Sequence, residues 1–189
     1  MDYQVCRITR KWKVLLFCGL VMVSSSAFSV KNYFEISASE MKMLPKFCKT
    51  GFSRYKLEGQ NWMNHLCPGL NALNHASLIY ENNATKKFAI IEALSHFSYT
   101  LEHTQSTFFH SFVYLKRGEA YELKRDMPKA ILDYQKALQL KPNNIGVHVA
   151  LIDVYLKLGD QSKARELIEH GLKIKPNSKS LLRRKKKIN

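Results

Sequence analysis

Proline and glycine are scarce in this sequence, with five and eight residues among 189. Their scarcity excludes a fibrous chain and a chain made mainly of linkers. Hydrophobic residues make up 46% of the chain and aromatic residues 11%, so there is enough apolar material for a packed core and wholesale disorder is not expected. The length leaves room for one domain of ordinary size once any leader has been removed.

Acidic residues are also few, because 15 Asp and Glu stand against 30 Lys and Arg, a formal net charge of +15. Such a surplus favours anionic partners such as nucleic acid, anionic lipid or an acidic protein. The simpler interpretation is that the lysines keep the surface soluble. The positive charge is spread along the chain except for a cluster at each end, which favours the simpler interpretation.

The N-terminal apolar run, Val14 to Val23, is shorter than the roughly 20 residues that cross a bilayer comfortably. A small-residue segment, residues 24–29, follows it, and four basic residues precede it: Arg7, Arg10, Lys11 and Lys13. This order is typical of a secretory signal peptide. We therefore predict that residues 1–29 direct export, to the periplasm or the outside, with cleavage after Ala27 or Ser29. An uncleaved N-terminal membrane anchor is the alternative.

Cysteine is rare as well, with four residues in the chain. Cys6 and Cys18 lie in the predicted leader, so the mature chain would keep Cys48 and Cys67. Two cysteines in an exported chain suggest one disulfide, and two free buried thiols are the alternative. Closing a loop of about 18 residues would stabilise the fold by about 3 kcal/mol in the chain-entropy model.

A 34-residue repeat is the most informative feature of the chain. Residues 111–144 align with residues 145–178 without a gap. Nine aligned pairs are identical, at Val113/Val147, Tyr121/Tyr155, Asp126/Asp160, Lys129/Lys163, Ala130/Ala164, Leu138/Leu172, Lys141/Lys175, Pro142/Pro176 and Asn143/Asn177.

Helical spacing within each copy predicts two helices separated by a turn. In the first copy Asp126 is the expected N-cap of the second helix and Pro128 lies in its first turn. Pro142 ends that helix, because proline cannot continue one. The second copy repeats the pattern, with a turn at Gly159-Asp160 and a stop at Pro176.

This helix–turn–helix resembles the tetratricopeptide-repeat (TPR) family, whose pattern runs G-x2-Y, A-x3-F, a small residue and P. The matching positions are Gly118, Tyr121, Ala130, Tyr134, Ala137 and Pro142, with Tyr134 in place of Phe. The resemblance implies an all-α solenoid of helical hairpins that binds other proteins and is not an enzyme. Ile152 replaces the usual Gly or Ala in the second copy, so its two helices are expected to lie slightly farther apart.

The sequence predicts six segments. They are a signal peptide (1–29), an N-terminal two-Cys segment (30–68), a divergent helical pair (62–106), two repeats (111–144 and 145–178), and a capping helix with a basic, solvated tail (179–189). The divergent pair supplies the third unit that a stable solenoid usually needs. The two-Cys segment is similar to exported bacterial TPR proteins at Pro45, Cys48, Trp62, His65, Cys67, Gly69, Leu70, Asn71, Asn74 and Ala76.

Sites for chemistry are lacking in the sequence, which has no catalytic-triad order, phosphate loop or dinucleotide fingerprint. His65, Cys67 and His75 suggest a metal site at first sight. A structural zinc site takes four ligands at recognisable spacings, and these three residues have neither. We expect a disulfide with partly buried histidines, no metal and no cofactor.

The TPR resemblance implies that stacked first helices line a concave groove. Its groove-facing residues would be Phe112, Leu115, Glu119 and Glu122 in the first repeat, and Gly146, Val149, Asp153 and Leu156 in the second. The family's carboxylate clamp needs Lys and Asn where this chain has Leu115, Glu119, Val149 and Asp153, so clamp-type binding is not expected. The acids predict a locally acidic groove, and solvated helix positions are the alternative.

The favoured function is therefore an exported TPR scaffold that binds an extended peptide or a partner helix. The partner segment would carry Lys or Arg beside an apolar side chain. Residues 30–189 hold 26 basic and 14 acidic residues, so one rival is a binder of nucleic acid or an anionic surface. A secreted effector is the other. Nucleic acid is not expected as a partner, nor is a membrane except through an uncleaved leader.

The leader gives the first testable prediction. Protein recovered from the cell envelope should lack the first 27 or 29 residues, because the small residues around Ala27 form a cleavage site. Intact-mass measurement checks this, and a full-length mass would favour the membrane anchor.

Overall fold

The computed structural model describes residues 42–49, 63–104 and 107–188. The chain divides into two compact units, residues 1–32 and residues 33–189, and every described residue belongs to the second. The predicted signal peptide therefore lies outside the described residues. So do Trp62 and most of the N-terminal two-Cys segment.

The described residues are helical and contain no strand. Their helices are α2 (Lys46–Lys49), α3 (Met63–Leu78), α4 (Ala84–His103), α5 (Thr107–Leu123), α6 (Met127–Leu140), α7 (Ile145–Lys157), α8 (Gln161–Ile174) and α9 (Lys179–Ile188). None of these helices is long and apolar enough to cross a membrane.

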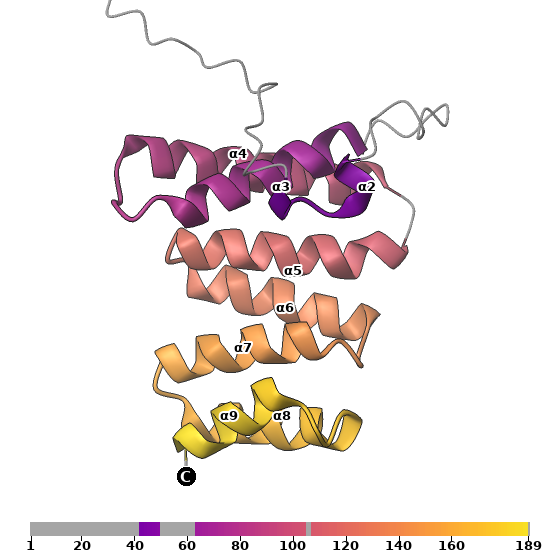
Figure 1. The fold of residues 1–189 in the computed structure, drawn as a ribbon, viewed down its shortest axis with the longest axis vertical. Helices are drawn as coiled ribbons and strands as arrows, with labels where there is room; N and C mark the ends of the chain where they lie inside the picture. The colour runs from indigo at the N-terminus through magenta and orange to yellow at the C-terminus, as the bar shows by residue number, and fades with distance from the viewer. Residues whose placement is uncertain (1–41, 50–62, 105–106, 189) are drawn as a thin grey trace, which may run out of the picture. The chain divides into compact units, whose positions relative to one another are not determined.

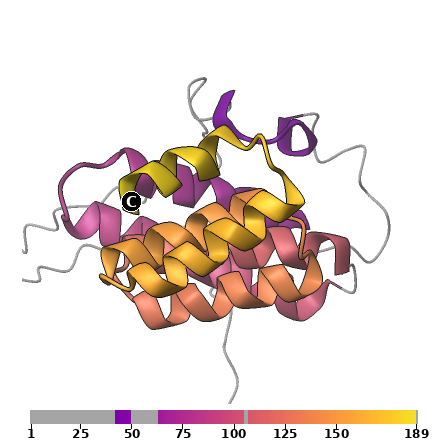
Figure 2. The ribbon, with the colours of Figure 1, turned by 90° about the horizontal axis from the view of Figure 1, so that it is seen from below.

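Three helical hairpins stack in chain order: α3 with α4, α5 with α6, and α7 with α8 (Figure 1). Helix α9 packs on α8 and closes the stack. The all-α hairpin solenoid with a capping helix, predicted from the sequence, is confirmed. Figure 2 shows α2 and α9 on one side of the stack and α6 on the other.

The second helices of the two repeats begin at equivalent aspartates. Asp126 accepts a hydrogen bond from the backbone N–H of Lys129 at 3.3 Å, and Asp160 accepts one from Lys163 at 3.0 Å. Each bond satisfies a backbone donor that has no partner within the helix. The predicted N-cap at Asp126 and the turn at Gly159-Asp160 are therefore observed, and they set where α6 and α8 start.

The turns before these caps place equivalent residues in the left-handed backbone region, at Arg125 (φ 65°) and Gly159 (φ 78°). In both turns two backbone hydrogen bonds run back to the preceding helix, from Arg125 to Glu122 and from Asp126 to Tyr121 in the first repeat. This is the Schellman arrangement, in which glycine is the usual residue. The first repeat therefore holds a side chain in a conformation that disfavours one.

The two repeats have different residues at the contact between the two helices of each hairpin. A Cβ on Gly118 would lie 2.4 Å from a ring carbon of Tyr134, so only glycine lets α6 approach α5 this closely. The equivalent residues in the second repeat, Ile152 and Ile168, are both buried. The prediction from Ile152, that α7 and α8 lie slightly farther apart than α5 and α6, stays a prediction.

The N-terminal described segment is linked to the first hairpin. The structure joins Cys48 of α2 to Cys67 of α3, with their Cα atoms 5.7 Å apart. Both cysteines are buried in the apolar cluster that also contains Leu44, Leu66 and Phe97. Helix α2 is thereby held against α3.

The two left-handed residues give a prediction about stability. Arg125→Gly should raise the free energy of unfolding by about 1 kcal/mol, because the left-handed region costs an ordinary residue roughly 1–2 kcal/mol. Gly159→Arg should lower it by a similar amount, since a Cβ there meets nothing within 4 Å and only the backbone opposes it. Urea unfolding of both variants measures the two changes.

Lys124→Gly is the matched control, because Lys124 is exposed and its φ is not positive. It should destabilise the protein, since glycine adds freedom to the unfolded chain without relieving any strain. A gain from Lys124→Gly as large as that from Arg125→Gly would contradict the conformational explanation.

Candidate functional site

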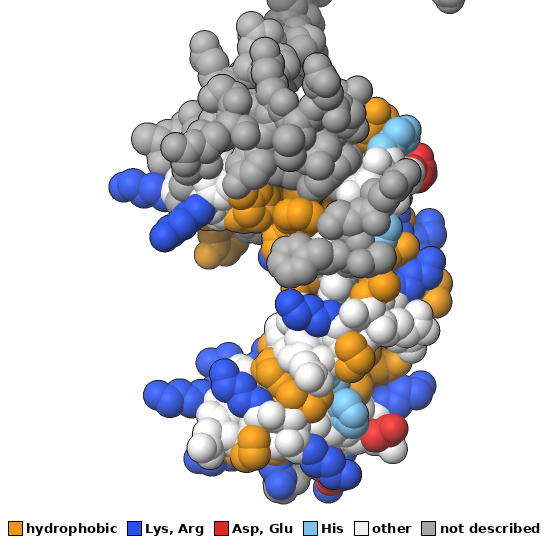
Figure 3. Space-filling view, turned by 90° about the vertical axis from the view of Figure 1, so that its right-hand side faces the viewer, with side chains coloured by type: hydrophobic (Ala, Val, Ile, Leu, Met, Phe, Trp, Pro, Cys, Tyr) orange, Lys and Arg blue, Asp and Glu red, His pale blue; other side chains and the backbone are white. Residues whose placement is uncertain are grey.

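The candidate site is the face formed by the first helices of the repeats, α5 and α7, and continued by α9. Figure 3 shows that this side of the molecule is hollowed. Seven of the eight predicted groove residues are half-buried, namely Phe112, Leu115, Glu119, Glu122, Val149, Asp153 and Leu156, and the eighth, Gly146, is exposed. Such side chains are anchored in the fold and still offer part of their surface to a partner.

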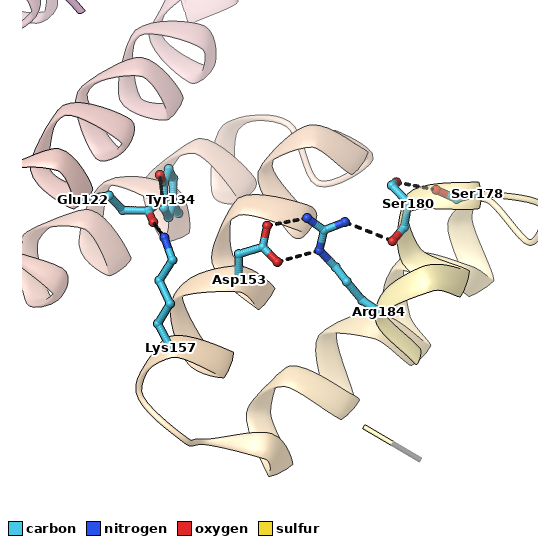
Figure 4. A network of polar contacts seen from close by, with 7 residues as sticks. All are labelled: Glu122, Tyr134, Asp153, Lys157, Ser178, Ser180 and Arg184. Atoms are coloured by element: carbon cyan, nitrogen blue, oxygen red, sulfur yellow. Dashed lines mark hydrogen bonds and ion pairs between the residues drawn. The ribbon is translucent and has the colours of Figure 1, made fainter. Parts of the chain in front are cut away.

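Glu122 on α5 connects the inside of the first repeat to the second repeat. It accepts a hydrogen bond from the hydroxyl of Tyr134 and forms an ion pair with Lys157 of α7, whose Nζ lies 2.5 Å from a carboxylate oxygen (Figure 4). Burial and the bond to Glu122 both raise the pKa of Tyr134, which therefore stays a donor. The carboxylate of Glu122 is thus shared between a core tyrosine and a lysine of the next repeat.

Asp153 on α7 makes the equivalent connection to the capping helix. The guanidinium of Arg184 binds both oxygens of Asp153 and also donates a hydrogen bond to the carbonyl of Ser180 at 3.0 Å (Figure 4). The side chain of Arg184 is 11% exposed and that of Asp153 38%. This paired contact has the geometry that makes arginine–carboxylate bonds strong, and it fixes α9 against α7.

Glu119 has a partner on its own helix. Both of its oxygens lie 2.9 Å from the Nζ of Lys116, three residues earlier on α5. Burial raises the pKa of Glu119, and although Lys116 opposes this shift, Glu122 adds to it.

Each of the three predicted groove acids thus has a cation of the same chain against it. The expectation of a locally acidic groove is not met at these carboxylates, because Lys116, Lys157 and Arg184 balance them. The sequence pattern missed these partners. Arg184 in particular lies in the basic tail that was expected to be solvated, whereas α9 continues to Ile188 and buries most of the Arg184 side chain.

The apolar groove residues are placed in two ways. Leu115, Val149 and Leu156 each pack partly on the core that α6, α7 and α8 share. Phe112 packs at the other end, where the ring of Phe47 from α2 lies 6.3 Å from it, centre to centre. No sequence pattern indicated Phe47, because its segment precedes the repeats.

The predicted metal candidates do not come together. Cys67 is joined to Cys48, and the Nδ1 atom of His65 lies 3.0 Å from that of His96 on α4. Burial lowers the pKa of both histidines, and the charge of His65 lowers that of His96 further. Among the described residues, no group of three or more histidine, cysteine or acidic side chains is arranged to hold a metal ion.

Comparison with known proteins identifies the repeats. Residues 124–186 match the family model described as tetratricopeptide repeat. The matched part of the chain carries the tetratricopeptide-repeat pattern. The match covers α6 to α9, and the TPR hairpin described above for α5 and α6 extends the pattern toward the N-terminus.

Two curated proteins contain similar TPR sequence. The Escherichia coli (strain K12) bacteriophage adsorption protein A is 32% identical over 76 residues, which is 40% of this chain and 8% of that protein. The BBSome complex member BBS4 of Bos taurus is 36% identical over 74 residues, which is 39% of this chain and 14% of that protein. The chain therefore matches only a small part of either relative.

Solved structures share the TPR fold at low sequence identity. The first TPR of Spaghetti (RPAP3), bound to the HSP90 peptide SRMEEVD, is 16% identical with a TM-score of 0.53, covering 70% of this chain and 95% of that one. The second TPR domain of human RPAP3, in complex with the HSP70 peptide SGPTIEEVD, is 15% identical with a TM-score of 0.52, covering 67% and 97%. The Hsp90 co-chaperone Cns1 of Saccharomyces cerevisiae is 18% identical with a TM-score of 0.50, covering 64% and 38%.

The contact between Asp153 and Arg184 gives a prediction. Asp153→Asn should lower the free energy of unfolding by about 1–2 kcal/mol, because it leaves a mostly buried guanidinium without its counter-charge. Arg184→Met should cost a similar amount, and the double variant should cost less than the sum of the two. Lys186→Gln is the exposed control on the same helix and should change stability by less than about 0.5 kcal/mol. Urea unfolding measures all four, and strict additivity would show that the pair contributes nothing.

Proposed function

We propose that this protein is an exported TPR scaffold, without enzymatic activity, that binds an extended peptide or a partner helix along α5 and α7. One observation carries the proposal. Leu115, Val149 and Leu156 are half-buried on the first helices, while the acids beside them are already paired within the chain. A partner that binds this face would therefore make mainly apolar contacts with it.

The internal ion pairs change the chemistry proposed for the partner. A basic side chain of the partner would have to compete with Lys157 or Arg184 for a carboxylate that is already satisfied. Exposed ion pairs contribute only about 0.2–1 kcal/mol, whereas a fully buried leucine contributes about 1.5–3 kcal/mol. The partner is thus held mainly by apolar side chains, and the charges around it act on specificity and association rate.

Peptide complexes of similar folds support a peptide partner. Two of the solved structures named above contain an HSP90 or HSP70 peptide that ends in Glu-Glu-Val-Asp. Leu115, Glu119, Val149 and Asp153 stand here where a carboxylate clamp has Lys and Asn. We therefore propose a peptide with apolar anchors rather than an acidic C-terminus.

The proposed setting is the periplasm or the outside of the cell. The order of basic, apolar and small residues in the first 29 positions supports it. A Cys48–Cys67 disulfide suits that setting, because disulfides persist in oxidising compartments.

A peptide-display selection tests the proposed groove. Peptides selected from a random library on the full chain should bind Leu115→Gln and Leu156→Gln at least tenfold more weakly, because each change removes an apolar contact worth more than about 1.4 kcal/mol. Leu132→Gln is the matched control, since Leu132 is 57% exposed on α6 and belongs to a second helix. Affinities are measured by calorimetry after unfolding curves have shown that the variants fold.

Replacing Glu119, Glu122 and Asp153 together with Lys is not a clean test, because it would also break the two ion pairs that join α5 to α7 and α7 to α9. Peptides that bind both leucine variants as tightly as the original chain would refute the groove. A further result would favour the anionic-surface rival. That result is binding with a steep salt dependence that disappears when five exposed cations of α9 are changed to Gln, namely Lys179, Arg183, Lys185, Lys186 and Lys187.

A further inference from the structure

A segment from outside the repeats lies against the predicted groove. The ring of Phe47, on α2, meets Phe109 and Phe112 of α5 edge-on, with ring centres 6.1 and 6.3 Å away and ring planes at 78° and 81°. Aromatic rings prefer this arrangement at these distances. Figure 2 places α2 on the same side of the stack as α9, opposite α6.

Helix α2 is too short to hold this position by itself. It has four residues, and isolated helices below about 12 residues are marginal in water. Contacts that hold it include the burial of Cys48 and of Leu44 just before it, the ring contacts of Phe47, and the covalent link of Cys48 to Cys67. The link keeps α2 near α5, because tethering raises the local concentration of a weakly bound segment to the millimolar range.

Phe112 is the point where this segment and the predicted groove meet. The ring of Phe47 packs edge-on against the ring of Phe112, and the Nζ of Lys116 lies 5.9 Å from the centre of the Phe112 ring. Phe47 therefore covers part of the surface that a partner would contact at the α5 end of the groove.

We propose that α2 is an intramolecular ligand of the α5 end of the groove, and that the partner segment places an aromatic side chain on Phe109 and Phe112 in place of Phe47. This inference rests on the proposed function and names the chemistry of one part of the partner. Phe47 shows which side chain the surface accepts, and its tether to Cys67 sets how strongly a partner must bind to replace it.

The competition has a defined thermodynamic form. The partner binds the form of the protein in which α2 has moved away, so its apparent dissociation constant equals the intrinsic one divided by the fraction of that form. A change that loosens α2 without altering α5 should tighten partner binding. A change at Phe112 should weaken the binding of both α2 and the partner.

The chain's own segment supplies the probe for a test. A synthetic peptide of residues 42–49, with Cys48→Ser to prevent disulfide exchange, is titrated into the full chain carrying Phe47→Ala. We expect saturable binding with a dissociation constant of about 0.1–1 mM, and backbone NMR shifts that concentrate on α5. The same peptide with Phe47→Ala should bind at least tenfold more weakly, because it lacks the ring that packs on Phe109 and Phe112.

The unmodified chain is the matched control, and it should bind the peptide at least tenfold more weakly than the Phe47→Ala chain because its own α2 occupies the site. Equal binding to both chains, or no dependence on the peptide's phenylalanine, would overturn the proposal. Phe112→Ala in the Phe47→Ala chain should remove binding, and binding that persists there would place the peptide elsewhere.

A second measurement covers the case in which Phe47→Ala does not fold. In the Cys67→Ser chain, the alkylation rate of Cys48 is followed by peptide mapping over a range of low urea concentrations. An α2 that leaves by itself gives a rate that hardly depends on urea, whereas a rate that follows global unfolding would show that α2 is a fixed part of the core and would overturn the proposal. Leu115 and Leu156 pack on a different apolar cluster from Leu44 and Cys48, so a failure of this inference and a failure of the proposed function are distinguishable.

Discussion

The close contact between Gly118 and Tyr134 is the constraint on which the groove depends. Because Gly118 has no side chain, the Tyr134 ring lies directly against α5, and its hydroxyl then reaches Glu122. Glu122 in turn holds Lys157 of the next repeat. One packing requirement inside a hairpin therefore brings a tyrosine hydroxyl to a carboxylate on the groove face, and that carboxylate also pairs with a lysine of α7.

The sequence was sufficient to predict the repeats and insufficient to predict their charge pairing. Hairpins, caps and stops follow from local residues such as Asp126, Asp160 and Pro142, whose effects act within one or two helical turns. Ion pairs between Glu122 and Lys157, or between Asp153 and Arg184, join residues more than 30 positions apart. They depend on how successive first helices align. Neither pair recurs in the other repeat, so the sequence holds no pattern from which these contacts could be predicted.

The position of Phe47 was hidden for a related reason. The two-Cys segment precedes the repeats and has no counterpart within them, so the 34-residue comparison is silent about where it packs. Cys48 and Cys67 indicated that the segment lies near the first hairpin, but not that it reaches α5. The contact of Phe47 with Phe109 and Phe112 arises from the fold, in which the end of α5 lies beside α3 and α2.

The net positive charge of the chain differs from the charge of the groove face, where acids and cations are paired. On the face of α5 and α7 the cations Lys116, Lys157 and Arg184 each neutralise an acid of this chain, and the last two of these pairs join neighbouring helices. The other cations of α9, Lys179, Arg183, Lys185, Lys186 and Lys187, are exposed to solvent. A large net charge is thus compatible with a groove whose remaining binding capacity is apolar. For this fold, the distribution of charge pairs decides what the groove can bind, and the net charge does not.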